Sequence, residues 1–331
     1  MNRFMIDVGT GLDPGMLEDF HNKMNEDDIL FVKRRAKTFD MQDEGLMLRH
    51  AGFEHIVVKK GYPKRGTDLI TCVKGKKEEP FLSVIVPIYN EENTAGVLLK
   101  QLIDRDWVIP TEFIIVESNS KDGTRDIALS YEGRDNVTVV LEDAPHGKGN
   151  GVLNGIRHAH GNIIAIQDGD LEYDVNDYDK LLQPFMEGRT HFVLGSRYNK
   201  ENWHMRQFGG SKSIIADYLN VGQVLLTGIL NMACGSKLTD PFTMYKIFDR
   251  DCMYGINFNG GNFGLDWELV IRFLRKGYKP VEIPISYNAR SYEEGKHIAL
   301  FKTPIEGLVA LWKSRVVAKV YDYGDDIVLD D

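Results

Sequence analysis

The sequence predicts an α/β protein whose main part has a mostly parallel central sheet flanked by helices. Short, continuous apolar runs alternate with helix-like segments from residue 82 to residue 194. This pattern is typical of strands that are buried on both faces of a parallel sheet. Polar residues follow several of the runs, at the sheet edge where such folds bind ligands. A charged seam that ends in proline, residues 74–80, separates this part from a smaller first unit.

The order of elements in the main part follows from the apolar runs and from helical periodicity. Each predicted strand is short and rich in β-branched or large apolar residues, and the predicted helices lie between strands. We expect strands at residues 82–88, 113–116, 137–141, 162–166 and 192–194. We expect helices at residues 91–103, 123–132, 151–159, 178–187 and 267–276.

The first unit is predicted to be small and of mixed α+β structure. Residues 16–50 have a largely helical pattern, and two short strands are expected at 54–59 and 68–73, around the turn-rich residues 61–66. The predicted domains are therefore this unit at residues 1–79, the main α/β domain at 80–320, and an acidic C-terminal tail at 321–331.

Composition excludes several classes of protein. With 331 residues, 43% hydrophobic and 27% charged, the chain is long enough for a large core, and its net charge of -9 argues against nucleic acid as the main partner. Cys72, Cys234 and Cys252 form no C-x-x-C pair, so neither a disulfide framework nor a zinc site is indicated. The N-terminus lacks the apolar core of a signal peptide, and polar residues interrupt the apolar segment 213–235. We expect a cytoplasmic protein without a transmembrane helix.

One apolar run, Ile163 to Ile166, leads into three acids at alternating positions, Asp168, Asp170 and Glu172. Alternate side chains of an extended segment point the same way, so these carboxylates would repel one another unless a cation lay between them. Oxygen ligands suit Mg²⁺ or Mn²⁺, and such an ion usually binds substrate phosphates as well. The pattern therefore predicts a divalent metal site that binds a nucleoside diphosphate.

Two other interpretations of these acids deserve comparison. A solvated turn or a helix cap would also place acids after a strand, and the residues leave this alternative open. An EF-hand loop is excluded, because it requires glycine at its sixth position, where this chain has Tyr173, and because it follows a helix.

Further motifs follow the predicted strands in a fixed order. They are VIVPIYNEE (84–92), VESNSKDGT (116–124), GKG (147–149), QDGDLEYD (167–174), GSR (195–197), TDP (239–241), FGLDWE (263–268) and RSYEEGK (290–296). In these motifs the sequence resembles the inverting family 2 glycosyltransferases with the GT-A fold. The resemblance is greatest to the branch with dolichol-phosphate mannose synthase and bacterial polyprenyl-phosphate glycosyltransferases, and it covers roughly residues 80 to 320.

The resemblance implies roles for the donor side of the site. Pro87, Tyr89 and Glu91 would line the pocket for base and ribose, although a plain strand-to-helix turn would explain them too. Glu117 would contact the nucleoside; many relatives have a second acid where this chain has Ser118, which leaves the base open. Lys148, between two glycines, would face the phosphates together with backbone N–H groups and the metal-binding Asp168.

The resemblance also implies two ways to activate an acceptor. A sugar hydroxyl would need a base, for which Asp266 or Glu268 is the candidate, although acids in the first turn of a helix also complement its dipole. A lipid phosphate would arrive ionised and need cations instead, since guanidinium groups match phosphate oxygens. Those cations would be Arg197, Arg206, Arg250, Arg290 and Lys296. Relatives often have two adjacent basic residues where this chain has Asp249 and Arg250.

The predicted function is that of a metal-dependent inverting glycosyltransferase. It would move a sugar from a UDP- or GDP-sugar to a polyprenyl-phosphate or glycan acceptor, with Mg²⁺ or Mn²⁺ as cofactor. Segments 213–235 and 300–320 mix apolar and basic groups, as expected for peripheral contact with the cytoplasmic membrane face or for a homodimer. The alternative function is a non-catalytic nucleotide-sugar-binding or scaffold protein that retains the fold.

The first unit carries a second, shorter resemblance. Residues 5–11, MIDVGTG, resemble the glycine-rich first motif of methyltransferases that use S-adenosylmethionine, and residues 45–73 resemble the closing strands of such a domain. Seventy-nine residues lack the middle strands of that fold. The unit is therefore interpreted as a remnant or a docking module.

Overall fold

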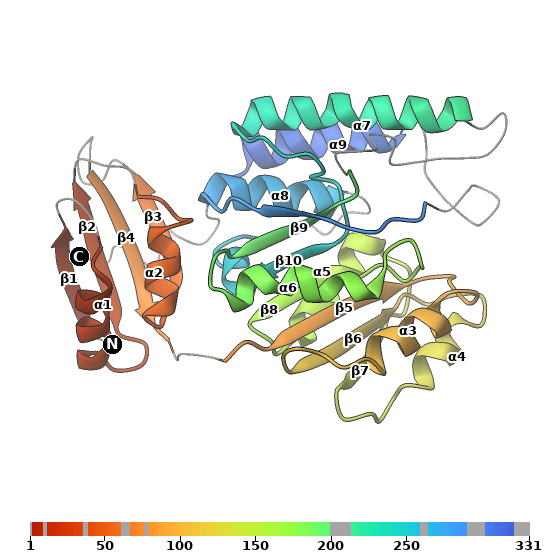
Figure 1. Ribbon diagram of the computed structural model, residues 1–331, viewed down its shortest axis with the longest axis horizontal. Helices are drawn as coiled ribbons and strands as arrows, with labels where there is room; N and C mark the ends of the chain where they lie inside the picture. Colours follow the sequence, from red (N-terminus) through yellow and green to blue (C-terminus); the bar gives the residue numbers. More distant parts are fainter. Residues whose placement is uncertain are drawn as a thin grey trace.

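The computed structural model describes residues 2–8, 12–35, 39–60, 67–75, 79–198, 213–258, 264–289 and 302–320, without the side chains of 213–219 and 302–306. Within these residues the strands form two sheets, one of four strands and one of seven. Figure 1 shows the two sheets side by side, joined by the seam near residue 80. How independently the two units fold stays a prediction.

The four-stranded sheet has the order β1-β2-β4-β3. Its strands and helices are β1 (Arg3–Val8), α1 (Pro14–Lys23), β2 (Ile29–Arg35), α2 (Glu44–His50), β3 (Phe53–Lys60) and β4 (Thr67–Lys74). Strands β1 and β2 are parallel, whereas β2 and β3 both pair antiparallel with β4. The two strands predicted near residues 54–59 and 68–73 are confirmed as β3 and β4.

The prediction that residues 16–50 are largely helical is wrong, because β2 separates α1 from α2. A short apolar run is compatible with a buried strand or a buried helix, and periodicity alone does not distinguish them. The burial of β2 shows why it is a strand. Leu30 and Val32 belong to the main core, while Ile29 and Phe31 form a second cluster with Leu69 on the other face of the sheet.

The seven-stranded sheet has the order β11-β9-β10-β8-β5-β6-β7, and β10 is antiparallel to both of its neighbours. Its strands are β5 (Leu82–Ile88), β6 (Thr111–Glu117), β7 (Val137–Leu141), β8 (Ile163–Ile166), β9 (Phe192–Ser196), β10 (Lys246–Asp249) and β11 (Val281–Pro284). All five predicted strands and a mostly parallel sheet are confirmed. The sequence analysis did not predict β10 or β11, which have four residues each.

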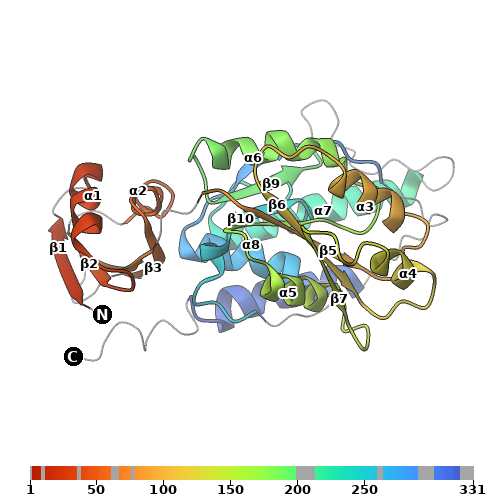
Figure 2. The same ribbon diagram turned by 90° about the horizontal axis from the view of Figure 1, so that it is seen from below.

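Helices cover both faces of this sheet. They are α3 (Ala95–Ile103), α4 (Thr124–Leu129), α5 (Lys148–His158), α6 (Tyr178–Met186), α7 (Ser213–Cys234), α8 (Gly264–Lys276) and α9 (Lys302–Trp312), with short helical turns η1 (Val175–Asp177), η3 (Arg250–Met253) and η5 (Lys313–Val317). Figure 2 shows α3 and α6 on one side of the sheet and α5 and α8 on the other. The predicted helices near 91–103, 123–132, 151–159, 178–187 and 267–276 are confirmed with shifted ends.

Glycine permits the close approach of α5 to the sheet. A methyl group at Gly155 would lie 2.4 Å from Cγ2 of Ile85 and 3.0 Å from Cγ2 of Val116. Such contacts are too short for a real side chain, so only glycine fits without a shift of the helix. The close packing fixes the first residue of α5, Lys148, near the carboxyl ends of β5 and β6.

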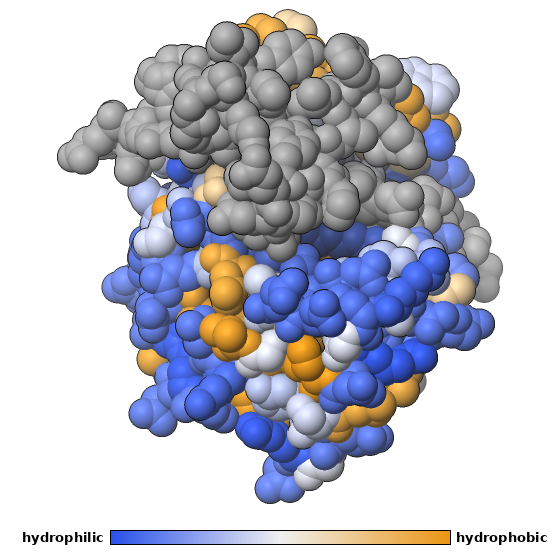
Figure 3. All heavy atoms as spheres, turned by 90° about the vertical axis from the view of Figure 1, so that its right-hand side faces the viewer, coloured by the Kyte–Doolittle hydropathy of each residue, from blue (hydrophilic) through white to orange (hydrophobic). Residues whose placement is uncertain are grey.

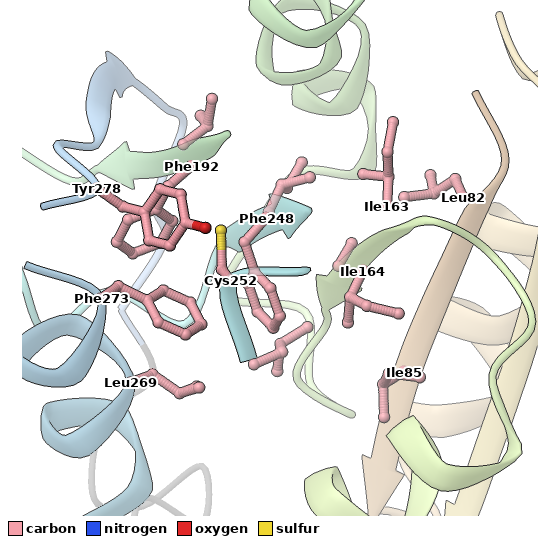
Figure 4. Packing of buried hydrophobic residues seen from close by; sticks show 14 of the residues in the cluster. Leu82, Ile85, Ile163, Ile164, Phe192, Phe248, Cys252, Leu269, Phe273 and Tyr278 are labelled. Carbon is pink, nitrogen blue, oxygen red and sulfur yellow. The ribbon is translucent and has the colours of Figure 1, made fainter. Parts of the chain in front are cut away.

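Aromatic packing fixes α8 against the sheet. Figure 4 shows Phe273 of α8 beside Phe192 of β9 and Phe248 of β10, with Leu269 one turn away. The ring centroids of Phe273 lie 5.2 Å from Phe192 and 5.1 Å from Phe248, in edge-to-face arrangements that aromatic pairs favour. Helices α7 and α9 pack in turn on α8. The first turn of α8 is thereby positioned relative to β9 and β10.

Because six of the seven strands are parallel, the sheet has two distinct edges. The carboxyl ends of β5, β6, β7, β8 and β9 lie at one edge, together with the first residue of β10, Lys246. The opposite, amino-terminal edge faces the four-stranded unit (Figure 1). Among the described helices, none is both long and apolar enough to cross a membrane.

Candidate functional site

The turn after β5 carries three of the predicted donor-site residues. Asn90 adopts a positive φ of 53° and holds the turn through its backbone N–H, which donates to Ser120 Oγ at 3.0 Å. Pro87 and the exposed ring of Tyr89 lie just before it. The Glu91 carboxylate accepts a hydrogen bond from the hydroxyl of Thr94 at 2.8 Å. The three residues therefore lie together at the carboxyl edge, where a base and ribose were predicted to bind.

Glu117 ends β6 and is completely buried. One of its oxygens accepts from the backbone N–H of Ser120 at 2.6 Å, and the other pairs with Nε of Arg125 at 2.7 Å. Arg125 also donates to the carbonyl oxygen of Glu142 at 2.8 Å. In this structure Glu117 thus binds the loop after β6 directly, and it is linked through Arg125 to Glu142, the residue after β7.

Glu142 is a carboxylate that the sequence analysis missed, although it follows β7 as the other polar residues follow their strands. It is buried and accepts from Ser118 Oγ at 2.7 Å. Its other oxygen accepts from the side-chain amides of Asn150 and Asn154 of α5, each at 3.1 Å. Glu142, which follows the adjacent strand, therefore contacts Ser118, and Ser118 is the position where many relatives have a second acid.

Lys148 begins α5, directly after Gly147, whose φ of 91° suits glycine. Its ammonium group forms an ion pair with Asp168, which follows β8. Burial would lower the pKa of Lys148, but Asp168, Asp266 and Asp170 outweigh it and raise the pKa above its ordinary value. Lys148 is therefore a firmly charged cation at the carboxyl edge, as a phosphate-binding lysine would be.

The segment after β8 is bent, so the prediction that its three acids point the same way is wrong. The chain turns at residues 169–172, where Asp170 Oδ1 accepts from the backbone N–H of Glu172 at 3.0 Å. Aspartate often forms such a bond two residues along the chain. Glu172 instead accepts from the hydroxyl of Tyr287 at 2.8 Å. In the described part of the chain, no three His, Cys, Asp or Glu side chains gather as a metal-ligand group.

Arg197 follows β9 and is engaged by a carboxylate. Its Nε and Nη2 donate to the two oxygens of Asp240 at 2.7 and 2.8 Å. Gln223 of α7 donates to Asp240 as well, at 2.9 Å. Burial would raise the pKa of Asp240, but the guanidinium of Arg197 outweighs it and holds the pKa below its ordinary value. The geometry gives Arg197 a supporting position beside the site, where direct action on a substrate stays a prediction.

Asp266 lies in the first turn of α8, and Nζ of the fully buried Lys246 lies 3.8 Å from its carboxylate. Burial raises the pKa of Asp266, against the lowering effect of Lys246 and Lys148. Burial likewise lowers the pKa of Lys246, although Asp266 opposes it. The sequence analysis did not single out Lys246, because β10 was not predicted. Glu268 lies two residues further along α8 and is buried.

Of the predicted acceptor cations, Arg197 and Arg250 lie in the described part of the chain, and the structure places them at opposite edges of the sheet. Arg250 follows β10, and because β10 is antiparallel its end lies at the amino-terminal edge, where the Arg250 guanidinium donates to the carbonyl of Ala159. The prediction that Arg250 binds acceptor phosphate beside the acids is therefore wrong. Arg206, Arg290 and Lys296 lie outside the described residues.

Comparison with known proteins decides the family. The family model described as Glycosyl transferase family 2 matches residues 83–238, which span β5 to β9 and α7. This domain belongs to glycosyl transferase family 2. The predicted recognition is confirmed, and the family 2 domain contains Glu91, Glu117, Lys148, Asp168 and Arg197.

Two curated relatives show which branch the family 2 domain resembles. The chain is 26% identical over 219 residues to dolichol-phosphate mannosyltransferase of Pyrococcus furiosus, covering 65% of this chain and 58% of that protein. It is 25% identical over 225 residues to a dolichyl-phosphate beta-glucosyltransferase of Trichomonas vaginalis, covering 63% of this chain and 66% of that protein. The chain thus spans less than two thirds of the length of either relative.

Solved structures confirm the GT-A fold. The glucosyl-3-phosphoglycerate synthase of Mycobacterium tuberculosis, crystallised with Mn²⁺, UDP-glucose and glycerol 3-phosphate, has a TM-score of 0.52 and 17% identity, covering 72% of this chain and 82% of that one. Mannosyl-3-phosphoglycerate synthase of Rubrobacter xylanophilus has a TM-score of 0.53 and 17% identity, covering 71% and 73%. At this level of identity the likeness concerns the fold.

Proposed function

We propose that the chain is a metal-dependent inverting glycosyltransferase that uses a nucleoside-diphosphate sugar. One observation carries the proposal: within a family 2 domain, the Lys148–Asp168 ion pair lies within electrostatic reach of Asp266 and Asp170. A cation for phosphates, carboxylates for a metal and a base candidate are thereby combined at one sheet edge. Ligands of open α/β sheets bind at this edge.

Each residue would perform a separate part of the transfer. Lys148 would neutralise the negative charge that develops on the leaving diphosphate. With a hydroxyl acceptor, Asp266 would accept the proton, and burial raises its pKa in the direction that favours a base; an ionised phosphate acceptor would need no base. Pro87 and Tyr89 would hold the nucleoside at the end of β5. Attack from the face opposite the leaving group would invert the anomeric centre.

The side chains present fit a divalent cation through Asp168 and Asp170. Oδ1 of Asp168 is buried and forms an ion pair with the ammonium group of Lys148, so this oxygen already has a cation as its neighbour. Carboxylate oxygens suit Mg²⁺ and Mn²⁺. Asp168 and Asp170 would hold the ion, which would stabilise charge on the diphosphate; Glu172 would join them only after releasing Tyr287.

An apolar surface on α7 and η5 favours a lipid-linked acceptor. Val221, Val224, Leu225 and Met232 lie at helical spacing on α7 and are exposed, Met232 by 82%, and Val316 of η5 is 67% exposed. Figure 3 shows apolar residues at the top of the molecule, the level at which α7 lies in Figure 1. The turn η5, which contacts α7 through Arg315, also contains the basic residue Lys313, and an apolar helix face near basic residues is suited to a membrane surface. We therefore propose a polyprenyl phosphate as the acceptor.

The first test measures nucleotide binding through the change that it causes in the melting temperature of the chain. UDP, GDP, CDP and dTDP, each with and without Mn²⁺, should include one nucleotide that stabilises the wild-type chain only with the metal. Asp170→Asn should lose that stabilisation, because it removes a carboxylate that is only 7% exposed and adjacent to the predicted ion.

Asp143→Asn is the matched control, because the Asp143 side chain lies at the same sheet edge but is 96% exposed. It should keep the metal-dependent stabilisation. A folded wild-type chain that responds to no nucleotide would contradict the donor site. Nucleotide binding without any turnover of the donor sugar, with polyprenyl phosphate or glycans present, would favour a non-catalytic nucleotide-sugar-binding protein.

A further inference from the structure

A second cavity lies at the opposite edge of the seven-stranded sheet, where the first unit meets the family 2 domain. Its volume is about 440 Å³. Arg49, His50 and Phe53 line it from α2 and β3, and His191 and Asp249 line it from the amino-terminal edge of the sheet. A cavity of this size is in the range of small-molecule sites. It is remote from Lys148 and Asp168, which lie beyond the other ends of the strands.

His191 contributes an unsatisfied hydrogen-bond acceptor to this cavity. The residue is 2% exposed, and its Nδ1 lies 2.5 Å from the carboxylate of Asp249. In the neutral ring, an Nδ1–H that donates to this carboxylate leaves the lone pair on Nε2. Nε2 has no hydrogen-bond partner and faces α2, 3.8 Å from where a methyl group on Gly45 would lie. A buried acceptor without a donor costs about 1–3 kcal/mol.

Asp251 provides a second unsatisfied acceptor beside the same interface. Its Oδ1 accepts from the backbone N–H of His55 at 2.9 Å and lies 3.0 Å from His55 Nδ1, so it joins β3 to η3. Its Oδ2 is buried and has no hydrogen-bond partner. His191 Nε2 and Asp251 Oδ2 are therefore two buried atoms at this interface with no protein hydrogen-bond partner.

The charges around the cavity favour the same kind of ligand. Three acids, Glu54, Glu79 and Asp249, line the cavity together with the guanidinium of Arg49. Burial would lower the pKa of Arg49, but Asp249 and Asp251 outweigh it and raise the pKa well above its ordinary value. Among the described residues that line the cavity, the three acids thus exceed the one formal cation, and a further cation would be attracted to them.

We propose that this cavity binds a small organic cation with N–H donors, an ammonium or guanidinium compound, whose N–H group donates to His191 Nε2. Phe53 and Phe185 supply the apolar walls for the organic part of the ligand. A metal ion is a poorer match, because no group of three His, Cys, Asp or Glu side chains in the described chain has the arrangement for one. A ligand at this place touches both units and stabilises their contact.

The test uses the full chain and four probes: spermidine, agmatine, L-arginine and L-lysine. Isothermal titration calorimetry should show saturable binding of at least one probe to the wild-type chain. His191→Phe keeps an aromatic ring but removes the acceptor, and should weaken that binding at least tenfold. Leu46→Trp fills the cavity from α2 without changing either acceptor, and should weaken binding to a similar extent.

Asp170→Asn is the control that separates this site from the donor site, since it should retain the cation while it loses the nucleotide. Circular dichroism and a cooperative melt establish that each variant is folded. The proposal is overturned if the folded wild-type chain binds none of the four probes. It is also overturned if His191→Phe and Leu46→Trp bind the probe as tightly as the wild type, which would mark an adventitious surface interaction.

Discussion

The two edges of the seven-stranded sheet both contain buried charges, but they organise them differently. At the carboxyl edge, Lys148–Asp168 and Arg197–Asp240 pair each carboxylate with a cation of the same domain. At the amino-terminal edge, Arg49 and His55 of the first unit meet Asp249 of β10 and Asp251 of η3, and two acceptors there have no hydrogen-bond partner. At the carboxyl edge, both partners of each ion pair come from the seven-stranded part of the molecule. At the amino-terminal edge, the first unit supplies the cations, and the remaining acceptors are suited to a cationic ligand.

The largest expected effect is a loss of stability when the Arg197–Asp240 ion pair at the carboxyl edge is broken. Arg197→Met leaves Asp240 buried without its guanidinium partner, and breaking a buried ion pair from one side costs about 3–5 kcal/mol. Urea unfolding should show a loss of this size. The double variant Arg197→Met with Asp240→Leu should recover much of it, because no uncompensated charge remains.

The matched control for Arg197 is Arg157→Met on the exposed side of α5. This change should alter the free energy of unfolding by less than about 0.5 kcal/mol, as surface substitutions generally do. If Arg197→Met destabilised the chain no more than Arg157→Met does, the Arg197–Asp240 pair would not support the carboxyl edge.

A smaller effect is expected at the amino-terminal edge. Asp251→Asn weakens the bonds to His55, and hydrogen bonds to charged groups contribute about 1.5–3 kcal/mol each. Burial would raise the pKa of Asp251, but His55, Arg49 and Lys276 outweigh it and lower the pKa well below its ordinary value of 3.8. The carboxylate therefore stabilises the fold above pH 3.8, and the contribution is lost as the pH falls toward the folded pKa.

The effect of Asp251→Asn is measured on the contact between the two units. Limited proteolysis of the seam near residues 74–80 should accelerate in Asp251→Asn at neutral pH, while nucleotide binding persists at the other edge. Cleavage at the wild-type rate would show that the first unit is held by other contacts. Loss of nucleotide binding together with faster cleavage would show that the two edges are coupled.

The contrast between the edges also explains what sequence can predict. Strand β5 was predicted with its observed ends because seven residues, Leu82–Ile88, form one largely apolar run closed by a polar turn. Lys148 and Asp168 were predicted as site residues from their position after a strand or before a helix. The fold's parallel order then brings them together, although twenty positions separate them in sequence.

Contacts that depend on the tertiary fold could not be predicted from the sequence pattern. Lys246 is the first residue of a four-residue strand, and no residue of β10 indicates that the strand is antiparallel. Its contact with Asp266 joins residues twenty positions apart in the sequence. The same direction reversal placed Arg250 at the wrong edge. The bend at Asp170 arises from a side-chain bond to its own backbone, which competed with the extended form that alternation suggested.

The smallest expected effect sharpens the assignment of Asp266 at the carboxyl edge. Lys246 lowers the pKa of Asp266 and so opposes the rise caused by burial. Lys246→Met removes this effect, so the pKa of Asp266 should rise further. Because a base acts only when ionised, the acid limb of the pH–rate profile with a glycan acceptor should move to higher pH, with little change of rate on the plateau. With a polyprenyl-phosphate acceptor, which arrives ionised, the limb should stay in place. A limb that does not move with either acceptor would remove Asp266 from the role of base.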